Sequence, residues 1–101
     1  MVIQRGMDTF SAVADPTRRA ILDLLVVRER SAGDLVSAFP TISQPAVSKH
    51  LRVLRDAGLV SMRVHAQQRI YGLQPKALAE LDAWIAKYKI FWSERLDALE
   101  Q

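Results

Sequence analysis

The stretch TISQPAVSKHLRVLRDAGLV, residues Thr41–Val60, contains a complete set of helix signals. Ser43 is of a residue type that caps helices, and Pro45 suits the first turn, where its missing N–H costs nothing. Gly58 is the residue type that most easily takes the left-handed conformation after a helix. These signals predict one helix between Ser43 and Gly58.

The predicted helix has two unlike faces when its residues are placed about 100° apart. One face is apolar and is expected to be buried: it carries Val47, His50, Leu51, Leu54 and Ala57. The other is basic and rich in hydrogen-bonding groups: it carries Gln44, Pro45, Ser48, Lys49, Arg52 and Arg55. Amide and guanidinium groups of this kind read base edges in a major groove and hold nearby phosphates. The pattern predicts a DNA-recognition helix, and the alternative is a solvated helix face that only keeps the domain soluble.

Positive charge is concentrated on this part of the sequence. Residues 43–69 carry five basic side chains against one acidic side chain, a net charge of +4, whereas the whole chain has a net charge of +3. Positive charge focused on one segment is typical of nucleic-acid binding.

Length and composition exclude several other classes. The 101 residues, half of them hydrophobic, predict a single domain over residues 1–101 with one core. No apolar run approaches the roughly 20 residues of a membrane span, and because the first ten residues contain no apolar h-region we expect no secretory signal. The chain has no cysteine, so it has no thiolate ligands and needs no oxidising compartment. We expect a cytoplasmic protein without a cofactor, and no catalytic motif indicates an enzyme.

Three further helices are predicted before Thr41. The first spans 2–13, with Ile3, Met7, Phe10 and Val13 at helical spacing. The second begins at Pro16, capped by Asp15, and runs to about Arg28. Its expected inward residues are Ile21, Leu22, Leu25 and Val26. Residues 31–34 have the spacing of a capping box and open a short helix at 35–39, which Pro40 ends.

The pattern after Gly58 changes to a β-hairpin followed by a long helix. Val60, Met62 and Val64 alternate with polar residues, and a second run of β-formers follows at 69–73, with 66–68 as the tip. A helix is then predicted from Lys76, some 24 residues and therefore about 36 Å long. Its apolar residues recur every three or four positions: Leu78, Leu81, Ile85, Tyr88, Trp92, Leu96 and Leu99. Such a helix is too long to lie entirely over so small a core.

The predicted fold is mainly α-helical with a small β-hairpin, in the order helix, helix, short helix, recognition helix, two strands, long helix. A short helix, a tight turn and a basic helix form a helix-turn-helix, and the hairpin after it is a wing. The sequence resembles the ArsR-type (ArsR/SmtB) winged helix-turn-helix repressors. The resemblance is carried by AVADPTRRAIL at 12–22, SQPAVSKHLRVLRDAGLV at 43–60, RIYGL at 69–73 and AELDAWIAKYKIFWSERLDALE at 79–100, the last being similar to a metal-independent branch.

The resemblance implies a homodimeric bacterial repressor on a near-palindromic operator in double-stranded DNA. The helix after Ser43 would enter the major groove, and the wing would reach the backbone or the minor groove. The first and last helices would form the dimer interface, which we assign to Met7, Phe10, Ile85, Tyr88, Trp92 and Leu96. The aromatic residues of the last helix leave a pocket for an organic ligand open as an alternative. The effector is unknown.

Other candidate DNA contacts lie outside the recognition face. Ser31 and Ser43 stand at helix starts, where free N–H groups hold phosphates or where the serines only cap. Arg18 either reaches the DNA backbone or pairs with a nearby carboxylate. In the wing the candidates are Arg63, His65, Gln67 and Arg69.

Two alternative functions remain at this point. A winged-helix module whose basic face binds an acidic protein has the same charge pattern. A metal sensor is disfavoured, because the segments where the family's sensors carry their ligands lack Cys, and residues 76–101 also lack His. His50 lies at the edge of the buried face and is interpreted as structural rather than as a metal ligand or a catalytic group.

Overall fold

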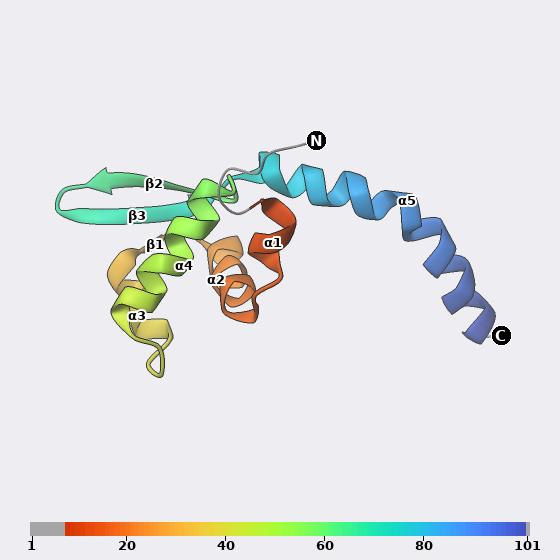
Figure 1. Cartoon of the computed structure of the whole chain (residues 1–101), viewed down its shortest axis with the longest axis horizontal. Coiled ribbons are helices and arrows are strands. Elements are labelled where there is room, and N and C mark those ends of the chain that lie inside the picture. Colours follow the sequence, from red (N-terminus) through yellow and green to blue (C-terminus); the bar gives the residue numbers. More distant parts are fainter. Residues whose placement is uncertain (1–7, 101) are drawn as a thin grey trace.

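The protein, described here over residues 8–100 by a computed structural model, is mainly helical. These described residues form five helices and three strands: α1 (Thr9–Val13), α2 (Pro16–Val27), β1 (Arg30–Ser31), α3 (Ala32–Ala38), α4 (Gln44–Asp56), β2 (Val60–His65), β3 (Gln68–Leu73) and α5 (Pro75–Glu100). In Figure 1 the helices α1–α4 pack together, the hairpin of β2 and β3 extends from one side, and α5 leads away from the other. The predicted order is confirmed, with β1 as an additional strand.

The predicted side-chain caps of α2, α3 and α4 are confirmed. Asp15 accepts a hydrogen bond from the Arg18 N–H at 3.0 Å, and the Ser43 hydroxyl accepts one from the Ala46 N–H at 3.2 Å. Ser31 forms the predicted capping box, although α3 begins at Ala32, earlier than expected. After α4, Gly58 has φ +78°, the left-handed conformation that its sequence position predicted.

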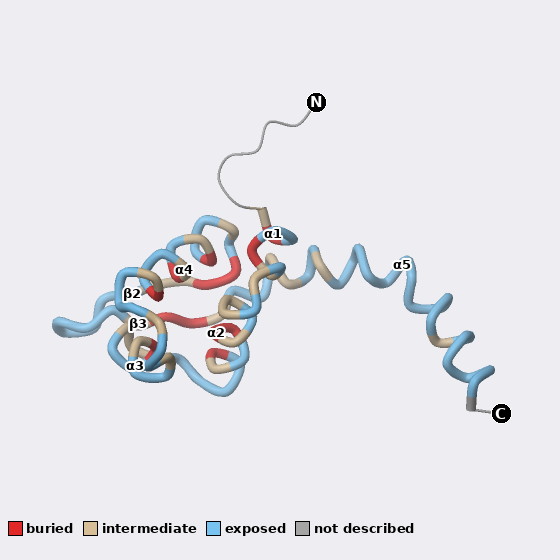
Figure 2. The backbone as a smooth tube through the Cα atoms, turned by 60° about the horizontal axis from the view of Figure 1, so that its bottom comes forward, coloured by how far each residue is buried: buried red, intermediate tan, exposed pale blue. Residues whose placement is uncertain are grey.

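The core lies between α2, α3, α4 and the base of the hairpin, where Figure 2 shows the buried segments together. Its buried apolar residues are Ala12, Ile21, Leu22, Leu25, Leu35, Val47, Leu51, Leu54, Leu59, Val60 and Tyr71. The prediction that Val26 points inward is wrong, since its side chain is 70% exposed. Ile21, Leu22 and Leu25 already fill the inward stripe of α2, and Val26 lies one step beyond it.

The three strands form an antiparallel sheet in the order β1-β3-β2. His65 pairs with Gln68, so the hairpin tip is the two residues Ala66 and Gln67 rather than the expected three. Ala66 has φ +56°, as a tight hairpin turn requires. The alternation of Val60, Met62 and Val64 with polar residues is typical of a half-buried strand, but Val64 is 66% exposed because this end of the hairpin extends beyond the core.

Helix α5 starts on the domain and then leaves it. Near its start the Thr9 hydroxyl donates to the Glu80 carboxylate at 3.2 Å, and the rings of Phe10 and Trp84 meet edge-on with centroids 5.6 Å apart. Further along, large apolar side chains remain exposed on α5: Ile85, Tyr88, Ile90, Phe91, Trp92, Leu96 and Leu99.

Helix α1 spans residues 9–13, whereas a helix was expected over 2–13, and Met7 lies outside the described residues. None of the described helices is both long and apolar enough to cross a membrane.

Candidate nucleic-acid interface

Helix α4 divides into the two faces that the sequence predicted. Val47, Leu51 and Leu54 are buried in the core. The side chains on the basic face are exposed to solvent, as predicted: Gln44, Pro45, Ser48, Lys49, Arg52 and Arg55. His50, expected at the edge of the buried face, is half-buried, and so is Ala57.

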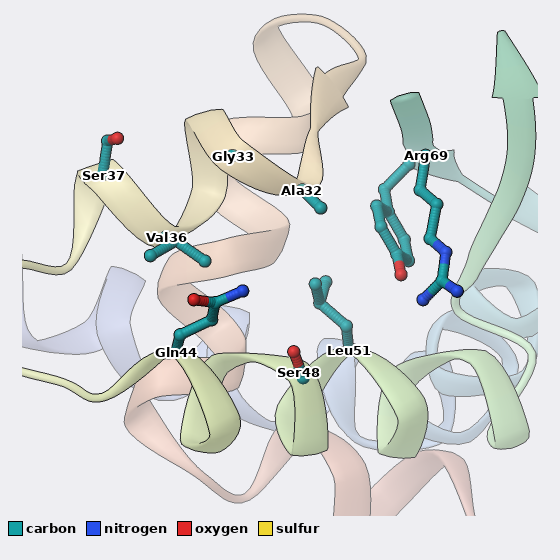
Figure 3. A pocket seen from close by; sticks show the side chains of 9 residues that line it. Ala32, Gly33, Val36, Ser37, Gln44, Ser48, Leu51 and Arg69 are labelled. Atoms are coloured by element: carbon teal, nitrogen blue, oxygen red, sulfur yellow. The ribbon is translucent and has the colours of Figure 1, made fainter. Parts of the chain in front are cut away.

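A groove separates α4 from α3 and β3. Its volume is about 390 Å³, and it is lined by Ala32, Gly33, Val36, Ser37, Gln44, Ser48, Leu51, Arg69 and Tyr71. In Figure 3, Gln44 and Ser48 point from α4 toward α3, while Arg69 reaches from β3 toward α4. The groove therefore brings one edge of the recognition face and a wing arginine to the same place.

Arg69 has a more central position than its place in a wing suggested. Besides the groove, it lines a smaller hollow of about 110 Å³ together with Ser48, Arg52, Arg55 and Tyr71. It also lines a third hollow beside the wing tip, with Ser31, Ala32, Gly33, Gln67 and Gln68. The sequence placed Arg69 on the wing but gave no sign that it faces α4. In the smaller hollow Arg69 lies beside Arg55 of α4 and Tyr71 of its own strand.

The two serines at helix starts differ in their electrostatic surroundings. The Ser31 hydroxyl accepts a hydrogen bond from the Asp34 N–H at 3.1 Å, and the Asp34 carboxylate lies back over the start of α3. Helix α4 has no acidic residue in its first turn, so the positive end of its dipole near Ser43 is not neutralised locally. The start of α4 is thus the more favourable of the two for a phosphate.

Arg63 is engaged within the protein. Its Nη2 donates to Oε1 of Glu29 at 3.0 Å. The Glu29 side chain lies over Gly72, where a Cβ atom would come within 3.0 Å of Oε2. Sequence reasoning missed this role of Glu29, and the only signal for it was a glycine in the middle of the run RIYGL, which marks a close approach.

The chain is similar in sequence to known bacterial regulatory proteins. The sequence pattern of the family described as "Bacterial regulatory protein, arsR family" matches residues 15–62. The chain is 39% identical over 92 residues to the HTH-type transcriptional regulator Rv2034 of Mycobacterium tuberculosis, covering 91% of this chain and 82% of that protein. It is 37% identical over 81 residues to the transcriptional repressor SdpR of Bacillus subtilis, covering 80% and 89% of the two chains. The protein belongs to the ArsR family.

Solved structures agree with this assignment for the ArsR-family chain. The crystal structure titled "Possible transcriptional regulator for arsenical resistance" superposes with a TM-score of 0.77 at 40% identity, covering 91% of this chain and 95% of the other. An ArsR family transcriptional regulator, RHA00566, superposes with a TM-score of 0.74 at 28% identity, covering 84% and 87%. The ArsR-family protein is therefore a winged-helix transcriptional regulator of a DNA-binding family and not an enzyme.

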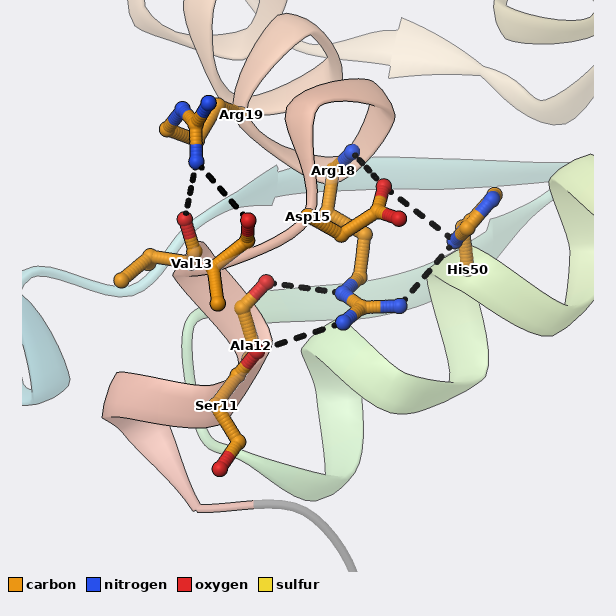
Figure 4. Close-up of polar contacts among 8 residues, drawn as sticks. Ser11, Ala12, Val13, Asp15, Arg18, Arg19 and His50 are labelled. Carbon is orange, nitrogen blue, oxygen red and sulfur yellow. Dashed lines mark hydrogen bonds and ion pairs between the residues drawn. The ribbon is translucent and has the colours of Figure 1, made fainter.

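In this ArsR-family protein Arg18 links three helices. Its Nε donates to the Ala12 carbonyl at 2.7 Å and its Nη2 to the Ser11 carbonyl at 3.2 Å, at the end of α1. Its Nη1 lies 3.3 Å from Nδ1 of His50 on α4 (Figure 4). Arg18 is thus engaged in contacts between helices, and its contact with the DNA backbone stays a prediction.

Asp15 completes this cluster from the start of α2. Its Oδ2 lies 4.0 Å from Nδ1 of His50 and accepts the hydrogen bond from the Arg18 N–H. That backbone hydrogen bond lowers the pKa of Asp15 below its usual value, and the charge of Arg18 contributes in the same direction. Residues 8–100 contain no group of three or more His, Cys, Asp or Glu side chains arranged to hold a metal ion.

Proposed function

We propose that the protein is a homodimeric repressor that binds a near-palindromic operator. In this proposal α4 of each subunit enters a major groove. The two half-sites lie about one helical turn apart, roughly 34–36 Å between centres. The wing follows the adjacent backbone or minor groove.

The observation that carries the proposal is the exposed, unpaired basic face of α4. Lys49 and Arg52 make no ion pair with any residue in 8–100, although the chain has eleven acidic side chains. Such cations lower the free energy of a complex with DNA, because they release condensed counterions from the phosphates. Local pairing within the protein would have reduced that gain.

Roles on this face follow from side-chain chemistry. Gln44 is suited to bidentate pairing with adenine and Arg52 to guanine, each with about 1–3 kcal/mol of discrimination against the wrong base. Ser48 adds a hydrogen-bonding contact with the DNA, and Lys49 adds a positive charge. Ser43, Pro45 and Gln67 complete the proposed surface at the start of α4 and at the wing tip. Ser31 remains a prediction as a phosphate contact, and the neighbouring Asp34 weighs against it.

The proposed dimer rests on the apolar surface of α1 and α5. Along α5 the side chains of Ile85, Tyr88 and Trp92 are between 39% and 49% exposed, and Leu96 is 56% exposed. Phe10 of α1 continues this surface through its contact with Trp84. Contiguous apolar surface of this extent marks an interaction site, and a two-fold axis covers the same patch on both subunits at once. Met7 stays a predicted member of this interface.

The test is to measure, by fluorescence anisotropy across a salt series, how the full chain binds DNA from upstream of its own gene. We expect saturable binding that resists a scrambled competitor, weakens steeply with salt and has two subunits per site. Lys49→Ala with Arg52→Ala should reduce both the affinity and the salt slope, while Lys87→Ala with Lys89→Ala, two exposed lysines on α5, serves as the charge-matched control. Equal, weak binding to both DNAs would contradict the proposal and favour an acidic protein as the partner of this face.

A further inference from the structure

We propose that the hollow lined by Ser48, Arg52, Arg55, Arg69 and Tyr71 is a phosphate-binding pocket that takes one phosphodiester group of the DNA backbone. The pocket is shared between α4 and the wing strand β3, so one phosphate would be held by both elements. This inference rests on the proposed function, because it names a contact within the same DNA complex.

The first argument is the charge in the pocket. Three arginine residues line a hollow of about 110 Å³. Within residues 8–100 none of the three makes an ion pair or a hydrogen bond to another side chain, and neighbouring Asp56 is not close enough to pair with them. Like charges gathered in this way repel one another until an anion lies between them. Guanidinium groups are the cations best matched to phosphate, because their planar N–H pairs bind two oxygens at once.

The second argument is independent of charge and concerns Tyr71. Its side chain is only 6% exposed and lines both this hollow and the larger groove. Its hydroxyl makes no hydrogen bond within the described part of the chain, and it is not among the groups sealed in the core. A buried tyrosine hydroxyl normally finds a partner. The Tyr71 hydroxyl is not sealed from solvent, so it is free to donate a hydrogen bond to an oxyanion bound in the hollow that Tyr71 lines.

Size and position favour a single backbone phosphate over a separate ligand. The hollow is well below the roughly 300–1,000 Å³ of pockets for organic molecules. Ser48 belongs to both the hollow and the recognition face, so an anion bound there lies beside any DNA strand on α4. Figure 3 shows Arg69 directed toward α4 and not outward along the wing.

The experiment compares Arg69→Ala and Tyr71→Phe with Arg28→Ala, which removes one exposed arginine that lines neither hollow. Operator affinity is measured across a salt series, and again with inorganic phosphate replacing chloride at equal ionic strength. We expect Arg69→Ala to weaken binding about tenfold or more and to reduce the salt slope by about 1, with Arg28→Ala near wild type. Wild type should be inhibited more by phosphate than by chloride, and both pocket variants should lose this preference. Thermal unfolding of each variant confirms that it is folded.

Three outcomes would overturn the inference. If wild type binds its operator and a folded Arg69→Ala behaves like Arg28→Ala, the pocket is refuted while the proposed function stands. If wild type is inhibited equally by phosphate and chloride, no specific phosphate site exists. If wild type ignores DNA yet binds inorganic phosphate at Arg69, as seen by NMR titration, the proposed function fails and the pocket holds a free anion instead.

Discussion

Arg63 in the wing and Glu29 in the loop after α2 form an ion pair, with 3.0 Å between Nη2 and Oε1. The pair links strand β2 of the hairpin to the loop after α2, and the absence of a side chain at Gly72 leaves room for Glu29. A cation that is already paired gains less from a phosphate than an unpaired one, because its first partner must be given up. Arg63 and Arg52 therefore differ in what they offer to DNA.

We expect Arg63→Ala to change operator affinity by no more than about twofold, while Arg52→Ala reduces it about tenfold or more. Both side chains of the pair are more than half exposed, so its loss should cost no more than about 1 kcal/mol of stability. Salt-dependent anisotropy and urea unfolding measure the two effects. Glu29→Gln breaks the same pair and keeps the arginine, so a large loss seen only in Arg63→Ala would show that Arg63 contacts DNA after all.

The lowered pKa of Asp15 makes its contribution to stability depend on acid pH. The unfolded chain takes up a proton at the ordinary pKa, about 3.9, before the folded chain does. The contribution is therefore complete above that value and is lost as the pH falls through the lower folded-state pKa.

Asp15→Asn isolates this effect, because asparagine caps a helix about as well and does not titrate. We expect the stability difference between wild type and Asp15→Asn to shift against wild type as the pH falls from about 5 to about 3. Urea unfolding across this range measures it, and Asp15→Ala should lose about 1 kcal/mol at neutral pH from the missing cap. A wild-type advantage that grew as the pH fell from about 5 to about 3 would contradict the assignment.

A glycine is needed at position 58 because of the backbone conformation there, and not because a larger side chain would clash with its neighbours. An added Cβ would lie 3.8 Å from Cβ of Ala77, an ordinary contact, but φ is +78°. We expect Gly58→Ala to destabilise the protein by about 1–2 kcal/mol, measured by urea unfolding. Gly58→Asn should lose less, because asparagine tolerates this conformation better. Equal losses in the two variants would point to a steric cause instead.

The apolar face of α5 predicts a change of assembly when a charge is placed on it. We expect Trp92→Glu to convert a dimer to a monomer in light scattering. A monomer holds a single half-site, so operator affinity should fall about a hundredfold or more. Lys87→Glu adds a carboxylate to the same helix at a position that is already polar, and it should leave the mass unchanged. A Trp92→Glu protein that remained dimeric would exclude this face from the interface.

The elements that sequence predicted well are those with local signals. The ends of α4 follow from Ser43, Pro45 and Gly58, which act through their own backbone neighbours. The buried stripe of α4 follows from helical spacing, because that helix has one apolar side only. The same locality explains the confirmed caps of α2 and α3.

Features that depend on tertiary contacts were missed. Strand β1 is two residues long and exists only because Arg30 and Ser31 pair with β3. Val64 alternates like a buried residue, but its exposure is set by how far the hairpin extends past the core. The position of Arg69 likewise depends on the angle between the wing and α4, which no local pattern contains. Glu29 joins the wing for the same reason.

The departure of α5 from the body of the domain also has a thermodynamic consequence. Its outer turns have no core beneath them, and isolated helical segments of that length are marginal in water. Their stability must then come by mass action from whatever covers the apolar face. If a second chain is that cover, the melting temperature rises with protein concentration, and operator occupancy depends on more than the first power of that concentration. The amount of protein in the cell would then act as a regulatory signal in its own right.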